Sequence, residues 1–253
     1  VSSVLSLFLW APIAIWYWWT HPTAVTWTGA AFIVLSGVLH CGYSIFLQRA
    51  YRAGDFTLVY PLARGTGPLL SSLAAIVFLG ERPSLIAGGG AIVIILSIFL
   101  LTGGHNLLRG KHDSGKALFY GIGCGVFIAS YTVSDQQGVT FALVPPLLLD
   151  WGGGLSRVVL FSPFAAKRWP EVRHVWKTYK LECFAVAILG PLAYILVLTA
   201  MKFAPLIYIA PMREVSILIG AFIGARVLKE ADGRRRIWAA AAMALGVIAL
   251  AFG

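Results

Sequence analysis

The chain has 253 residues, of which 59% are hydrophobic and only 12% charged, and its mean hydropathy is +0.83. This composition excludes an ordinary soluble globular domain and indicates several membrane spans. The net charge of +10 does not predict a nucleic-acid partner, because the basic residues cluster in short connections between apolar segments, where they set membrane orientation.

Nine apolar segments are long enough to be membrane helices, at about 1.5 Å per residue across a hydrocarbon core of about 30 Å. In chain order they are roughly 1–20, 27–49, 56–79, 84–102, 117–138, 142–166, 182–201, 205–228 and 235–252. Most of the tryptophans at positions 10, 16, 18 and 19 are typical of interfacial anchors. The three cysteines lie inside apolar segments without metal-ligand or redox spacing, so we expect no metal and no cofactor. We predict an all-α polytopic membrane protein.

The connections between these segments alternate in charge. One set holds 15 of the 20 Lys and Arg residues and lies around 49–55, 103–116, 167–181 and 226–236. The other set holds two and lies around 21–26, 80–83, 139–141 and 202–204. Basic connections stay on the cytoplasmic side, so we predict a multi-pass protein of the cytoplasmic (inner) membrane with its C-terminus outside. The basic connection at 167–181 also suits contact with anionic lipid.

An internal repeat relates the two halves of the chain. PLARG at 61–65 aligns with APMRE at 210–214, and with the same offset of 149 residues Glu81 aligns with Glu230. Applied to 117–138, this offset points to a helix before Val1, so we expect a parent fold of ten helices whose first helix is absent from this chain. Five helices per half is an odd number, so the halves are inverted, and inverted repeats bind substrate near the membrane midplane.

The repeat divides the chain into three predicted parts. Residues 1–102 form the first repeat, corresponding to helices 2–5 of the parent fold, and 117–253 form the second, corresponding to helices 6–10. Residues 103–116 are the expected cytoplasmic linker.

The repeated motifs also carry a resemblance to a known family. The run 43–102 contains AYRAGDFTLVYPLARGTGPLL and FLGERPS, and the second half contains SYTVSDQQG at 130–138 and APMREVSILIGAFIG at 210–224. With these motifs the chain resembles the EamA-type drug/metabolite transporter superfamily, and YPLARG with MREVS is most similar to a branch associated with phosphonate utilisation. The resemblance implies a ten-helix inverted repeat that carries small solutes, often outward.

Two arginines inside apolar segments are the leading candidates for binding a solute. Arg64 and Arg213 are equivalent in the repeat and are predicted to approach the midplane from opposite sides. A guanidinium group matches carboxylate or phosphonate oxygens in a bidentate manner. Tyr60 and Ser71 share the helix face of Arg64 and are further candidates. The alternative is that each arginine is fixed by a buried carboxylate or by backbone carbonyl groups.

Other polar residues within the segments are candidates to line the same cavity. His40 and Tyr43 lie about one turn apart, and Tyr131 and Tyr194 occur in the second half. The buried His40 could instead be an ordinary core residue. Asp150 and Arg157 are seven positions apart on one helix, so we interpret them as a structural ion pair.

Two carboxylates are candidates for proton coupling. Glu214 follows Arg213, and Asp135 lies near the outer end of its segment. Burial favours the neutral form of a carboxyl group, which would let either residue take up and release a proton. The alternative is a fixed ion pair with an arginine.

From these observations we expect a secondary active transporter, acting as an exporter of a small polar or anionic metabolite by alternating access, and not an enzyme. Its partners would be the solute, the lipid bilayer and protons, and it would be a monomer or a homodimer. The alternative is a membrane-embedded enzyme or flippase acting on a lipid-linked phosphate, with Arg64 and Arg213 as phosphate clamps and Glu214 as acid and base. The duplication favours the transporter, because alternating access uses pseudo-symmetry directly.

Overall fold

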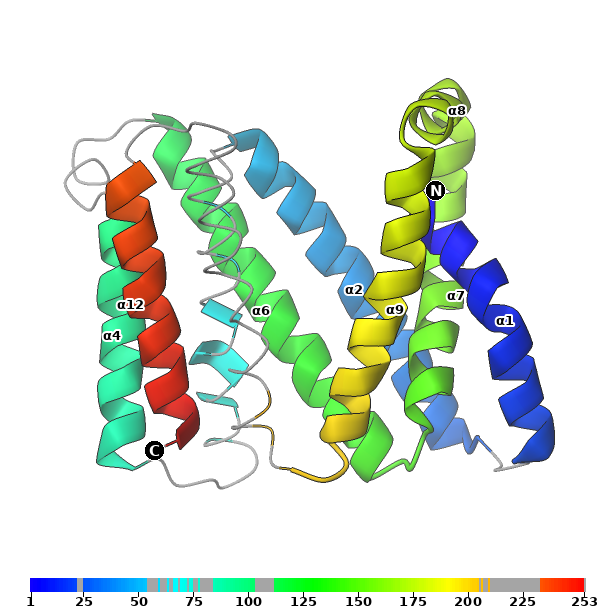
Figure 1. Cartoon of the computed structure of the whole chain (residues 1–253), viewed down its shortest axis with the longest axis horizontal. Helices are drawn as coiled ribbons and strands as arrows, with labels where there is room; N and C mark the ends of the chain where they lie inside the picture. The colour runs from blue at the N-terminus through cyan, green and yellow to red at the C-terminus, as the bar shows by residue number, and fades with distance from the viewer. Residues whose placement is uncertain are drawn as a thin grey trace. The chain divides into compact units, whose positions relative to one another are not determined.

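The computed structural model describes residues 1–21, 25–53, 84–102, 112–204 and 233–252, with short stretches between 59 and 77 and residues 206 and 209. All regular elements in these ranges are α-helices, which confirms the predicted helical class (Figure 1). They are α1 (Ser2–Thr20), α2 (Trp27–Ala53), α4 (Leu85–Thr102), α6 (His112–Thr140), α7 (Pro146–Lys167), α8 (Trp169–Thr178), α9 (Lys180–Ala200) and α12 (Gly233–Phe252). Most of the predicted segments 56–79 and 205–228 lies outside the described residues.

Several helices have the length and the composition of membrane spans. Among the described residues these are α1, α2, α9 and the part of α6 from Gly115 to Thr140. Apolar side chains are exposed along them, for example Phe8 on α1, Val34 on α2 and Leu189 on α9. Lipid can cover such side chains, whereas the helix satisfies its own backbone hydrogen bonds. The protein is therefore membrane-embedded.

The chain forms two compact units, and each unit combines segments from both predicted repeats. Unit 1 consists of residues 1–41 and 134–204, and unit 2 consists of residues 42–133 and 205–253. The helices α2 and α6 each contribute residues to both units.

Small residues bring α2 and α7 close together in unit 1. A Cβ atom on Gly37 would lie 2.4 Å from Cβ of Ser156 and 2.9 Å from the carbonyl oxygen of Gly153. A Cβ atom on Gly152 would likewise lie 2.6 Å from Cγ2 of Ile33. Close backbone approach at small residues is how membrane helices gain van der Waals contact, because lipid removes the hydrophobic drive between them. In the same unit, α1 packs against both α7 and α9.

Three prolines lie inside helices of unit 1, and for two of them a side chain binds the carbonyl group that the proline releases. Proline has no N–H group, so the carbonyl group four residues earlier loses its helical partner. For Pro191 this is the Ala187 carbonyl, which accepts a hydrogen bond from Nε1 of Trp10 at 3.2 Å. For Pro163 it is the Val159 carbonyl, which accepts from Oγ of Ser162 at 2.8 Å. Trp10 therefore joins α1 to α9 rather than serving only as an interfacial anchor.

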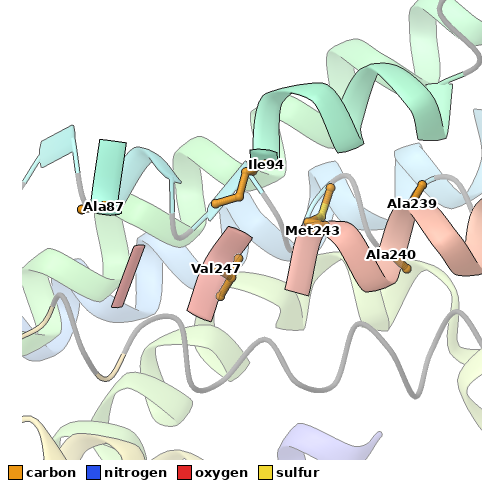
Figure 2. Close-up of a cluster of buried hydrophobic side chains, with 6 residues drawn as sticks. All are labelled: Ala87, Ile94, Ala239, Ala240, Met243 and Val247. Atoms are coloured by element: carbon orange, nitrogen blue, oxygen red, sulfur yellow. The ribbon is translucent and has the colours of Figure 1, made fainter. Parts of the chain in front are cut away.

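One hydrophobic core of unit 2 lies between α4 and α12. These helices pack against each other through buried side chains, of which Ile94 and Met243 are the largest (Figure 2). A Cβ atom on Gly246 would lie 2.8 Å from the Gly90 carbonyl oxygen, so glycine allows the close approach. The cluster comprises Ala87, Ile94, Ala239, Ala240, Met243 and Val247.

The predicted connection at 167–181 contains the additional helix α8. Val172 and Trp176, four residues apart, are half-buried, and the Trp176 ring lies 5.8 Å from the Phe184 ring of α9, measured between centroids. Apolar residues at this spacing form one face of a helix, which explains why the segment is helical. α8 lies across the ends of α7 and α9 (Figure 1).

Candidate functional site

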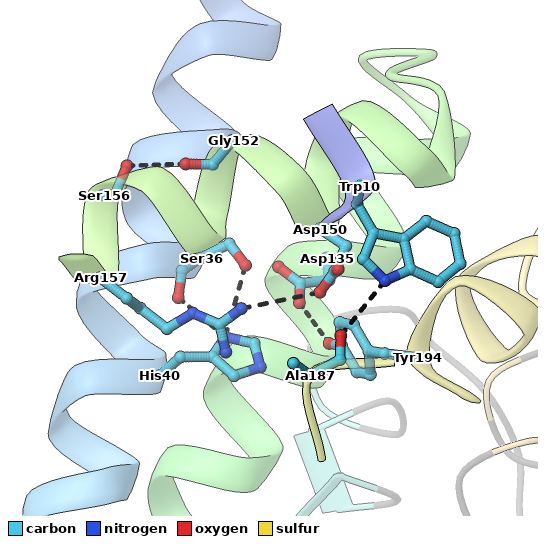
Figure 3. Close-up of polar contacts among 10 residues, drawn as sticks. All are labelled: Trp10, Ser36, His40, Asp135, Asp150, Gly152, Ser156, Arg157, Ala187 and Tyr194. Carbon is cyan, nitrogen blue, oxygen red and sulfur yellow. Dashed lines mark hydrogen bonds and ion pairs between the residues drawn. The ribbon is translucent and has the colours of Figure 1, made fainter. Parts of the chain in front are cut away.

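Three of the predicted site residues, from three different helices, come together in unit 1. His40 is on α2, Asp135 on α6 and Tyr194 on α9 (Figure 3). We call these three residues, together with Ser36 of α2, the polar cluster. The positions of its members are set by the local helices: Ser36 and His40 are one turn apart, so they share a face.

Asp135 is the most buried ionisable residue of the polar cluster. Its exposed fraction is 0%, and its Oδ2 atom accepts a hydrogen bond from the Tyr194 hydroxyl group. An ionised carboxylate is costly in an apolar environment unless it is hydrogen-bonded or neutralised by a proton. The Tyr194 hydroxyl group therefore supplies a donor that a carboxylate buried at this position requires.

His40 lies beside Tyr194 at the other end of the polar cluster. The two rings are edge-on, with centroids 5.4 Å apart and an interplanar angle of 84°. Nδ1 of His40 is 2.9 Å from the Ser36 carbonyl oxygen and 3.4 Å from the Ser36 hydroxyl group. A carbonyl oxygen only accepts hydrogen bonds, so Nδ1 carries a hydrogen atom, and the lone pair of the neutral ring is on Nε2. Tyr194 thus contacts both other side chains, because its hydroxyl group donates to Asp135 and its ring lies edge-on to His40.

The residues on either side of Asp135 add polar atoms that sequence reasoning did not select. Within the described part of the chain, Oγ of Ser134 and Oε1 of Gln136 are buried and have no hydrogen-bond partner. Native proteins leave few such atoms, and each calls for an explanation such as a bound solute or water. On one α-helix these two side chains point about 200° apart, so they mark two separate polar positions and not one site beside the carboxylate.

The predicted ion pair on α7 is confirmed. Nη2 of Arg157 lies 3.7 Å from Oδ1 of Asp150, and the exposed fractions of the two side chains are 29% and 10%. Nε of Arg157 is buried and has no hydrogen-bond partner among the described residues. The ion pair with Asp150 therefore engages only part of the Arg157 guanidinium group. Arg157 lies on α7, the helix that packs closely against α2 at Gly37.

The remaining candidates that the structure describes belong to unit 2. In unit 2, Tyr43 and Tyr131 are edge-on with centroids 5.9 Å apart. Oγ of Ser71 donates to the Gly67 carbonyl oxygen at 2.9 Å, so it binds its own helix. Four further predictions lie outside the described residues: Tyr60, Arg64, Arg213 and Glu214. In the described ranges, no group of three His, Cys, Asp or Glu residues could hold a metal ion.

Comparison with known proteins adds information on the fold. No family model matches the chain, and no curated protein matches it. A solved structure, "Crystal structure of protein", matches with a TM-score of 0.58 over 99% of this chain and 98% of that chain, at 16% identity. At this identity the likeness shows a shared fold and nothing about activity.

Sequence reasoning could have found one of two missed contacts in unit 1, but not the other. The i, i+4 spacing of Ser36 and His40 is a local signal that could have placed Ser36 in the site. The contact between Trp10 and the Ala187 carbonyl joins positions 177 residues apart and has no local signal except the later Pro191.

Proposed function

We propose that this protein is a secondary active transporter that moves a small polar or anionic metabolite by alternating access, coupled to proton movement at Asp135. The observation that carries the proposal is the complete burial of Asp135 in a helix of membrane-spanning type, with its carboxylate bound by Tyr194. Ionisable residues inside membrane helices are rare and commonly belong to substrate pathways or proton relays.

The helix bounds support a five-plus-five inverted repeat of the drug/metabolite transporter type. Adding 149 to the bounds of α4, 85 and 102, gives 234 and 251, and α12 covers Gly233–Phe252. Adding 149 to the bounds of α1, 2 and 20, gives 151 and 169, and α7 covers Pro146–Lys167. The related helices also pack against each other, α4 with α12 and α1 with α7. Such pseudo-symmetry is the basis of alternating access in many transporters.

In the proposed cycle, Asp135 binds a proton in one state of the carrier and releases it in the other. When Asp135 is protonated, the closed site without water does not have to bury a charge, which would cost free energy. When Asp135 is ionised, the Tyr194 hydroxyl group stabilises the carboxylate through its hydrogen bond. His40, edge-on to Tyr194, is the second proton-exchanging group of the proposed cycle. Arg157 supplies a cationic donor for an anionic group of the solute. Arg64 and Arg213 keep their proposed role as further anion ligands.

The proposal can be tested with the full chain in proteoliposomes loaded with a pH-sensitive dye. The probes are amino acids, organic acids, phosphorylated sugars and alkylphosphonates, each added with and without a pH gradient. We expect one class to move together with protons. Asp135→Asn should abolish uptake driven by the pH gradient and retain exchange of the solute across the membrane.

Ser130→Ala is the matched control, because Ser130 is exposed on the same helix and its hydroxyl group binds the Val126 carbonyl of that helix at 2.8 Å. This variant should transport like the wild type. An Asp135→Asn protein that inserts normally and keeps the wild-type pH dependence would remove Asp135 from the coupling mechanism.

A further inference from the structure

The helix α8 differs from the other described helices in its position and its composition. One residue separates it from the end of α7, and one residue separates it from the start of α9, a candidate membrane span. It contacts both helices and lies across their ends (Figure 1). A helix at the end of a membrane span, with its axis across that span, lies at the surface of the bilayer.

Apolar and basic residues occupy different sides of α8. At 3.6 residues per turn, its apolar residues fall within about one third of the helix circumference. These residues are Trp169, Val172, Val175, Trp176 and, just after the helix, Tyr179. Arg173 and Lys177 lie next to this face, one turn apart, and both are exposed. This separation is typical of a helix that lies in the membrane interface.

The protein itself covers only part of the apolar face. Val172 and Trp176 are half-buried, and Trp176 contacts Phe184 of α9. In contrast, Trp169, Val175 and Tyr179 are 62%, 39% and 50% exposed. Tryptophan and tyrosine are the residues that prefer the level of lipid headgroups.

The net positive charge of residues 167–180 favours lipids with anionic headgroups. Residues 167–180 hold five Lys or Arg residues and one acid, Glu171, which pairs with Arg168 at 3.5 Å. This leaves Lys167, Arg173, Lys177 and Lys180 as cations without an acidic counterpart in the segment. We propose that α8 is a docking surface for anionic phospholipid, with its aromatic side chains at headgroup level and its basic residues on the lipid phosphates. This proposal does not depend on the transported solute.

The test uses the full chain in bilayer nanodiscs made with photoactivatable analogues of phosphatidylglycerol or phosphatidylcholine. Crosslinked residues are located by mass spectrometry. Crosslinks from phosphatidylglycerol should concentrate at residues 167–180 and should exceed those from phosphatidylcholine. Arg173→Gln with Lys177→Gln should reduce the excess about 30-fold, because each Lys or Arg near an anionic surface contributes about fivefold.

The matched control is Arg52→Gln with Lys116→Gln, which removes the same charge from exposed positions in unit 2. It should leave crosslinking at α8 unchanged. Raising the salt concentration on the wild-type chain gives the same test without a substitution and should also lower the excess.

Three results would overturn the proposal. The first is equal crosslinking by the two lipids at α8. The second is an equal loss in both double variants, which would show that only the total charge matters. The third is an excess that does not change when the salt concentration is raised, which would show that the charges of α8 do not hold the lipid.

Discussion

The hydrogen bond from Tyr194 to Asp135 joins two helices through residues 59 positions apart. It provides a hydrogen-bond donor to a carboxylate that is fully buried, so we expect its loss to lower the stability of unit 1. The Tyr194 ring also contacts His40 of α2, and His40 is in turn hydrogen-bonded to Ser36. At the scale of single residues, we expect substitutions in the polar cluster to show which contacts stabilise the fold and which are needed for transport.

Tyr194→Phe removes the donor and keeps the ring that packs against His40. We expect the free energy of unfolding to fall by about 0.6–2 kcal/mol, the usual range for a hydrogen bond between membrane helices. The measurement is unfolding by SDS in mixed micelles. Tyr179→Phe is the control, because Tyr179 is exposed and should tolerate the change. Equal stability of Tyr194→Phe and the wild type would show that the bond contributes nothing, and a double-mutant cycle with Asp135→Asn would measure the coupling directly.

Trp10→Phe tests whether the indole N–H group stabilises the Ala187 carbonyl that Pro191 releases. The variant keeps an aromatic ring on α1 and leaves this carbonyl without its donor. We expect a loss of about 1 kcal/mol in the same unfolding measurement. Trp16→Phe, at an exposed position on the same helix, should cost less. If both variants lose the same stability, the hydrogen bond is not the cause.

At the scale of elements, the contact between α2 and α7 depends on the absence of a side chain at Gly37. The nearest atoms to a Cβ atom there belong to Ser156 and to the backbone of Gly153, and backbone cannot move aside without shifting the helix. This contact positions the helix that carries His40 against the helix that carries Arg157.

We therefore expect Gly37→Ala to destabilise the protein by about 1–3 kcal/mol, the typical cost of overpacking. Gly190→Ala on α9 should be neutral, since a Cβ atom there meets nothing within 4 Å. Adding Ser156→Gly to Gly37→Ala should recover part of the loss, because it removes the closest clash. Thermal unfolding in detergent, followed by circular dichroism, gives the comparison. A stable Gly37→Ala protein would mean that the two helices can move apart freely.

At the scale of the whole molecule, the alternation of basic and neutral connections predicts which ends of the helices face the cytoplasm. Single cysteines can test this, because the native Cys41, Cys124 and Cys183 are buried. A membrane-impermeant thiol reagent should label Phe141→Cys and Phe203→Cys in intact cells. Both positions are exposed, and they lie in the connections at 139–141 and 202–204, which hold few basic residues and are predicted to face outside. Thr178→Cys on α8 should react only after permeabilisation. Labelling of position 178 from outside would reverse the predicted orientation.

The amino-acid sequence by itself determined the helical class and most of the helix bounds. The reason is that a membrane-spanning segment must be apolar over a length set by the bilayer and must satisfy its own backbone hydrogen bonds. Both requirements are local, so the segment expected at 84–102 is the helix Leu85–Thr102. The Asp150–Arg157 pair was also predictable, because both residues are on one face of one helix.

Only the tertiary structure decided which residues of different helices meet. His40, Asp135 and Tyr194 were separate candidates, and packing of α2, α6 and α9 brings them into one cluster. The partner of the Ala187 carbonyl and the close approach at Gly37 have the same origin. Inside a membrane every helix has an apolar surface, so hydrophobicity does not specify its neighbours. The neighbours are specified by small residues and by hydrogen bonds between distant positions, which become visible only when the helices are packed.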